Sequence, residues 1–168
     1  LAPPALDLAF LVDSTGSMGD ELAYVNAEVA SIVERVRDAL PAVDVRVGAT
    51  FYRDRGDRRP LEQIPFTPDV ATFTSHLAHV TASGGGDYPE DLHAGLAAAL
   101  TTLDWERRQA VRVLVVIGDA PPQRYGDATY DARDAMRDAS RRGIRILPVA
   151  ASGANRVVEA LFRAMGVT

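Results

Sequence analysis

The stretch LDLAFLVDSTGSMG (residues 6–19) decides the fold of this chain. Its apolar run, residues 8–12, ends at Asp13 and is followed by turn-forming residues, which is typical of a buried parallel strand. In open α/β sheets, ligands bind in the loops at the carboxyl ends of such strands. Residues 13–17 therefore form a candidate binding loop.

This loop carries oxygen-bearing side chains at alternating positions, Asp13, Thr15 and Ser17. One carboxylate and two hydroxyls are hard donors, which suit Mg²⁺, Ca²⁺ or Mn²⁺ better than zinc or copper. Ser17 also stands where a helix N-cap would, with Asp20 three residues later as a partner resembling a capping box. The pattern by itself leaves two interpretations open, a metal site or a helix cap preceded by a turn acid.

The motif DSTGSM (residues 13–18) at the end of an apolar strand resembles the metal-ion-dependent adhesion site of von Willebrand factor type A domains. The signature of that site is Asp-x-Ser-x-Ser, and a threonine stands here in the middle hydroxyl position. Two further segments match in the family's order, the glycine-rich SGGGDYPED (residues 83–91) and the apolar strand VLVVIGDAPP (residues 113–122). The resemblance covers nearly the whole chain and implies one domain over residues 1–168.

The resemblance also implies a ligand set, with one departure from the family. Integrin-type members supply a threonine from the glycine-rich segment, and this chain has none between residues 84 and 92. Asp87 is the nearest oxygen donor after the glycines, and Glu90 is the second choice. Asp91 fits better as a residue that complements the positive end of the following helix. The implied metal ligands are Asp13, Thr15, Ser17, Asp87 and Asp119.

In this family the bound cation keeps an open coordination position, which takes an acidic residue of a partner protein. The resemblance therefore implies a protein-binding module that uses Mg²⁺, or else Mn²⁺ or Ca²⁺, and that forms part of a larger protein. A first alternative is a Mg²⁺-dependent phosphatase of the haloacid dehalogenase type, with Asp13 as the phosphoryl acceptor. Such enzymes carry a second aspartate where this chain has Thr15, and they use a lysine. A second alternative is a metal-free scaffold of the same fold.

Composition narrows the function classes further. The chain has 168 residues, the size of one domain, and a net charge of −5, with no cluster of arginines and aromatic residues that would suit nucleic acid. It contains no cysteine and no lysine, which excludes thiolate and Schiff-base chemistry and the P-loop lysine. We expect a bacterial source from the arginine and alanine richness. We also expect no membrane span and no signal peptide in this sequence, and the localisation, cytoplasmic or extracellular, stays open.

Strands alternate with helices along the rest of the chain. This alternation predicts a doubly wound, mainly parallel α/β sheet of the Rossmann-like type, with helices on both faces and one antiparallel edge strand. The edge strand comes from a hairpin whose charged turn is RDRGDRR (residues 53–59). We expect the strand before Asp119 to lie beside the first strand, and Asp127 to cap the helix that follows. Family members end with a further strand and helix, so either these lie outside this sequence or the domain is shorter than its relatives.

Two short motifs have simpler explanations than function. Arg55-Gly56-Asp57 matches an integrin-binding tripeptide, but short motifs have many chance matches, and we interpret this one as part of a solvated turn. His76 and His79 have a spacing that can hold a metal on one helix face. Because no third nitrogen or sulfur ligand accompanies them, we expect surface histidines.

Overall fold

The computed structural model describes residues 4–84, 91–105, 109–122, 125–127, 129–151, 154 and 156–166, without the side chain of Asp20. Within these residues the chain forms one mixed sheet of five strands: β1 (Ala5–Asp13), β2 (Asp44–Tyr52), β3 (Leu61–Thr67), β4 (Ala110–Gly118) and β5 (Ile144–Ala150). Their order across the sheet is β3-β2-β1-β4-β5. All neighbours are parallel except β3, which pairs antiparallel with β2 at one edge. This arrangement confirms the predicted fold class, including the antiparallel hairpin and the place of β4 beside β1.

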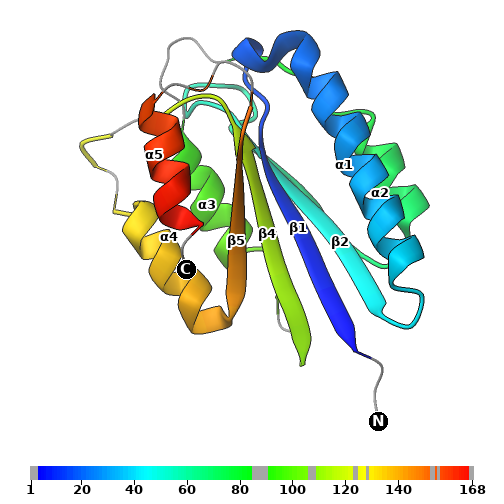
Figure 1. Cartoon of the computed structure of the whole chain (residues 1–168). Coiled ribbons are helices and arrows are strands. Elements are labelled where there is room, and N and C mark those ends of the chain that lie inside the picture. The colour runs from blue at the N-terminus through cyan, green and yellow to red at the C-terminus, as the bar shows by residue number, and fades with distance from the viewer. Residues whose placement is uncertain are drawn as a thin grey trace.

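Helices cover both faces of this sheet. They are the short 3₁₀ helix η1 (Gly16–Met18), α1 (Gly19–Ala39), α2 (Val70–Leu77), α3 (Leu92–Thr101), α4 (Ala132–Arg142) and α5 (Arg156–Met165). Figure 1 shows α1 and α2 on one face and α3, α4 and α5 on the other. Among the helices described here, none is both long enough and apolar enough to cross a membrane.

The central strand β1 explains why its sequence is a continuous apolar run. Phe10 and Val12 point into the core under α1 and α2, whereas Ala9 and Leu11 point into the core under α3, α4 and α5. All four side chains are fully buried. A strand that is buried on both faces cannot alternate apolar with polar residues.

Aspartates cap both α2 and α4. Asp69 caps α2, because its side chain accepts hydrogen bonds from two first-turn amides. The prediction that Asp127 caps α4 was wrong: Asp131 is the cap and forms a capping box with Asp134. Asp127 instead forms an ion pair with Arg55, at 2.7 Å, from the β2–β3 turn. Asp127 therefore pairs with a residue that is distant in sequence, which the local helix pattern could not indicate.

The packing of Gly95 in α3 leads to a first prediction. An added Cβ would lie 2.9 Å from the Cβ and Cγ of Tyr52, which is fully buried on β2. Gly→Ala in a helix interior normally stabilises by about 1 kcal/mol, whereas overpacking a core costs about 1 to 3 kcal/mol. We therefore expect Gly95→Ala to lower the free energy of unfolding by up to about 2 kcal/mol.

Urea denaturation monitored by circular dichroism checks this prediction. Gly56→Ala is the control, because a Cβ at Gly56 has no atom of the structurally described residues within 4 Å. Stabilisation by Gly95→Ala would show that α3 can move away from Tyr52 at little cost.

Candidate metal centre

The two predicted acidic strand ends lie side by side. β1 and β4 pair in parallel register up to Val12 and Ile117, and Asp13 and Asp119 follow at the same edge of the sheet. A Cβ added to Gly118 would lie 3.6 Å from the Cβ of Asp13 and 2.7 Å from the hydroxyl of Tyr52. Glycine at this position therefore leaves room for the Tyr52 hydroxyl between the end of β4 and Asp13.

A chain of hydrogen bonds joins the two acids through the predicted hydroxyls. The Thr15 amide and hydroxyl both donate to Asp13 Oδ1, at 2.9 and 2.6 Å. The Thr15 and Ser17 hydroxyl oxygens lie 3.0 Å apart, and Ser17 in turn hydrogen-bonds to Asp119. Four of the five predicted site residues thus meet at one place.

The alternative interpretation of Ser17 as a helix cap was wrong. Ser17 lies inside η1, and the residue before α1 is Met18, which makes no side-chain cap. The Ser17 hydroxyl turns toward Thr15 instead of toward the amides of the next turn. Local sequence could not separate these outcomes, since both use the same hydroxyl.

The surroundings of Asp13 strongly shift the pKa of its carboxyl. Burial raises the pKa of its carboxyl from 3.8 to about 6, and the negative charge of Asp119 adds to this rise. Hydrogen bonds from Thr15 and Tyr52 lower the pKa but offset the rise only in part. The second carboxylate oxygen, Oδ2, is buried and accepts no hydrogen bond of ordinary length from the described residues.

The pKa of the Asp119 carboxyl is raised as well. Burial raises the pKa of its carboxyl, and the charge of Glu21 in the first turn of α1 raises it further, whereas the hydrogen bond from Ser17 lowers it. Its Oδ1 is also buried without a hydrogen-bond partner in the described part of the chain. Glu21 did not stand out in the sequence, where it is one acid among several in a polar helix start.

The loop that carries these residues is held by backbone hydrogen bonds from two sides. The Ser14 amide and hydroxyl both donate to Tyr52 O, at 3.0 and 3.2 Å. On the other side, Gly16 N donates to Gly84 O at 3.0 Å, and Ser83 N donates to Ser14 O at 3.1 Å. The end of β2 and the segment after α2 therefore fix where Thr15 and Ser17 point.

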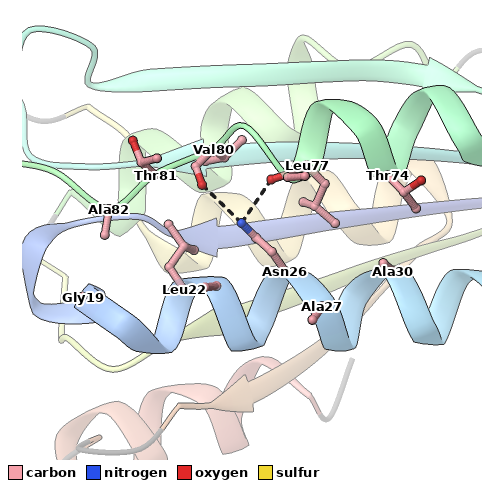
Figure 2. Close-up of a pocket in the computed structure, with 12 residues that line it drawn as sticks. Gly19, Leu22, Asn26, Ala27, Ala30, Thr74, Leu77, Val80, Thr81 and Ala82 are labelled. Atoms are coloured by element: carbon pink, nitrogen blue, oxygen red, sulfur yellow. Dashed lines mark hydrogen bonds between the residues drawn. The ribbon is translucent and has the colours of Figure 1, made fainter.

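That second segment is anchored in turn by a buried asparagine. Asn26 of α1 donates from Nδ2 to Leu77 O, at 3.2 Å, and to Val80 O, at 3.4 Å, where α2 ends (Figure 2). The hollow around it has a volume of about 670 Å³, and its lining in the described residues contains no charged side chain. We therefore assign Asn26 a structural role, which is to position the chain that leads to Ser83 and Gly84.

The glycine-rich segment is described only at its two ends. Asp87 and Glu90, the first and second choices for the fifth ligand, lie outside the described residues. Asp91 caps α3 by accepting a hydrogen bond from Ala94 N, at 3.1 Å, which agrees with its predicted helix role. Within the described ranges, no three acidic, histidine or cysteine side chains converge on one point.

The donor set nevertheless suits a hard divalent cation. One buried and one partly buried carboxylate converge with two hydroxyls, and each carboxylate keeps one buried oxygen that accepts no hydrogen bond of ordinary length from the described residues. Buried polar atoms in native proteins are normally partnered, and unpartnered ones often mark a bound ion or a functional site. The donor types fit Mg²⁺, Mn²⁺ or Ca²⁺.

The other motifs do not join this centre. His79 lies exposed, with Nδ1 2.6 Å from Ser75 O. Arg55 of the Arg-Gly-Asp tripeptide lies over the ring of Tyr125, at 3.9 Å from its centroid, and pairs with Asp91 and Asp127. Arg55 therefore links the β2–β3 turn to Tyr125, Asp127 and the residue before α3.

Comparison with known proteins adds a family match. The family model for the von Willebrand factor A domain matches residues 7–128. Among curated relatives, the alpha-protein kinase vwkA of Dictyostelium discoideum is 25% identical over 86% of this chain and 23% of its own length. Human von Willebrand factor A domain-containing protein 7 is 33% identical over 58% of this chain and 10% of its own length. The chain thus spans a quarter or less of these relatives, in which the matching part is a domain within a larger protein.

Solved structures agree on the fold. The pilus adhesin SpaC of Lactobacillus rhamnosus GG superimposes with a TM-score of 0.66 at 14% identity, over 98% of this chain and 26% of SpaC. Proximal thread matrix protein 1 of the mussel byssus superimposes with a TM-score of 0.67 at 13% identity, over 95% of this chain and 39% of that protein. At such low identity, these matches bear on the architecture alone.

Proposed function

Because this chain belongs to the von Willebrand factor A domain family, we propose that it is a protein-interaction module that captures its ligand through a divalent cation. The observation that carries this proposal is the pair of neighbouring carboxylates, the buried Asp13 and the partly buried Asp119, bridged by the hydroxyls of Thr15 and Ser17. Each carboxylate has one buried oxygen that accepts no hydrogen bond of ordinary length within the described part of the chain. A cation at this point would neutralise both acids and partner both oxygens.

We assign the ligand roles in the proposed centre by chemistry. Asp13 and Asp119 would supply the negative charge, and Thr15 and Ser17 would supply neutral oxygens directly or through water. Mg²⁺ favours six oxygen ligands and retains waters, so these four side chains leave room for an oxygen from outside. The bound cation would supply Lewis acidity and charge, which attract a carboxylate of a partner protein. Asp87 remains our candidate for completing the set.

Two features of the sequence, Thr15 at the position of a second acid and the absence of lysine, argue against the phosphatase alternative. An acid two positions after Asp13 would be needed, and Thr15 occupies that position and donates to the Asp13 carboxylate. The chain also contains no lysine. The kinase activity in the name of one relative belongs to a protein of which this chain spans 23%, so we do not transfer it to this chain. Our proposal is a binding role without catalysis.

Calorimetric titration with Mn²⁺, followed by competition with Mg²⁺, tests the proposal. We expect the wild-type protein to bind Mn²⁺ and Asp119→Asn to weaken binding at least about tenfold, because even outer-shell changes at metal sites cost 10- to 100-fold. Glu34→Gln is the control, since it removes one negative charge from an exposed position on α1. Equal binding by wild type and Asp119→Asn would exclude this centre, and no binding by the wild type would favour the metal-free scaffold. Mg²⁺-dependent turnover of an aryl phosphate would favour the enzyme.

A further inference from the structure

A second cavity, lined with arginines, adjoins the candidate metal centre. It has a volume of about 400 Å³ and lies between the β2–β3 turn and the segment that follows α2. We call it the arginine pocket. Three arginines and two acids line it, together with four uncharged residues: Arg53, Arg58, Arg59, Asp57, Glu62, His79, Thr81, Ser83 and Gly84. Its arginines come from the charged turn RDRGDRR, which the metal centre does not use.

Arg53 forms the buried base of the arginine pocket. The residue is 4% exposed, and its guanidinium donates to two backbone carbonyls, Arg59 O at 2.9 Å and Thr81 O at 3.1 Å. Its Nε is buried without a partner among the described residues. The carboxylate that pairs with it is Glu62, at 3.9 Å. A desolvated cation with such a distant counter-charge makes the pocket attractive to an anion.

Arg58 and Arg59 add two exposed cations at the mouth. In the described part of the chain, neither side chain forms an ion pair within 4 Å or a hydrogen bond. The turn of residues 53–59 holds four arginines and two aspartates, although the whole chain has a net charge of −5. The lining of the arginine pocket holds three of these arginines against two acids, Asp57 and Glu62, so its net charge is +1 in a chain whose net charge is −5.

The arginine pocket and the metal centre share a wall. Gly84 lines the pocket, and its carbonyl accepts the hydrogen bond from Gly16 N, between Thr15 and Ser17. Ser83, also in the lining, donates from its amide to Ser14 O. One extended ligand could therefore reach both places.

We propose that the arginine pocket is an anion subsite, which receives a carboxylate of an acidic protein segment whose other carboxylate binds at the metal centre. This inference rests on the proposed function and specifies its partner: a segment with at least two acidic residues, rather than a single acid. The arginines select for the second acid by charge complementarity, which governs specificity and association rate more than total affinity.

Binding of a short synthetic oligoglutamate peptide to the full chain in Mn²⁺ tests this inference by calorimetry. We expect Arg58→Gln/Arg59→Gln to weaken peptide binding about tenfold and to reduce its salt dependence, with Mn²⁺ affinity at least equal to wild type. Arg133→Gln/Arg137→Gln is the matched control, since it removes two exposed arginines of α4 and changes the net charge equally. The control should change peptide affinity less than about twofold.

The outcomes separate this inference from the proposed function. Equal losses in both double variants, or no loss at Arg58 and Arg59, would overturn it, as would binding of inorganic phosphate without binding of the peptide. Peptide binding that needs Arg58 and Arg59 but not Mn²⁺ would support the anion subsite and count against the metal-dependent function. If Mn²⁺ binds and the peptide does not, the proposed metal centre stands and the subsite fails.

Discussion

Replacing Asp13 with asparagine should stabilise the metal-free protein while removing its affinity for divalent cations. Burial and the charge of Asp119 raise the pKa of Asp13 to about 6 from 3.8. This shift corresponds to about 3 kcal/mol against the ionised carboxylate in the folded state at neutral pH. An amide in the same place keeps an acceptor for the Thr15 donors and carries no charge.

The pH dependence has a definite sign. A carboxyl group whose pKa is higher in the folded than in the unfolded state holds its proton more tightly when folded. Its contribution to stability is therefore fully present below about pH 4 and is lost as the pH rises through about 6. Relative to Asp13→Asn, we expect metal-free wild-type protein to lose up to about 3 kcal/mol of unfolding free energy across this range.

A divalent cation should reverse the order of the two proteins. Ligand at 1,000 times its dissociation constant stabilises the folded state by about 4.1 kcal/mol, which exceeds the deficit of about 3 kcal/mol, so wild type should become the more stable protein in Mg²⁺ or Mn²⁺ at that concentration. We expect Asp13→Asn to gain almost none and to bind Mn²⁺ at least about 100-fold more weakly, because it loses a proposed direct ligand.

Chemical denaturation at several pH values, with and without Mn²⁺, measures both effects. Glu34→Gln again serves as the charge control, because its side chain is exposed. Lower stability of metal-free Asp13→Asn at pH 8 would contradict the electrostatic argument. Unchanged Mn²⁺ stabilisation in that variant would contradict the metal site.

Gly84→Ala should cause a large loss of stability. Gly84 has φ of +76°, a conformation that costs an L-residue about 1 to 2 kcal/mol. An added Cβ would also overlap the carboxylate of Asp57, which accepts a hydrogen bond from Asp54 N at 3.1 Å. Displacing that carboxylate adds an overpacking cost, so we expect a total loss of about 2 to 4 kcal/mol. Mn²⁺ affinity should fall as well, because Gly84 O accepts the hydrogen bond from Gly16 N.

A double-mutant cycle separates the two causes of this loss. In an Asp57→Ala background the carboxylate is gone, so Gly84→Ala should cost only the backbone strain of about 1 to 2 kcal/mol. Gly126→Ala is the control, because a Cβ there meets no atom of the described residues within 4 Å. Thermal unfolding and urea denaturation give the values. A loss at Gly84 no larger than that at Gly126 would refute the steric argument.

The sequence predicted most of the fold, and the physical reason is the strength of its local patterns. Residues 8–12 form an apolar run with no alternation, which only a strand buried on both faces requires, and β1 is such a strand. The failures came where a short polar side chain had two possible partners. Ser17 and Asp127 both fit helix caps by spacing, but Ser17 contacts Thr15 and Asp127 pairs with Arg55.

The sequence by itself determined that two acids, Asp13 and Asp119, stand at the carboxyl ends of apolar strands. Because parallel strands place such ends at one edge of a sheet, it also indicated that the two acids lie near each other. Only the tertiary structure decided how deeply these two acids are buried and which charges lie near them. The burial that raises the pKa of Asp13 and the approach of Glu21 to Asp119 depend on contacts between distant segments. The arginine pocket beside them has the same origin, since it forms where the β2–β3 turn meets the segment after α2. Desolvation and proximity are properties of packed neighbours, and no local pattern of residues encodes them.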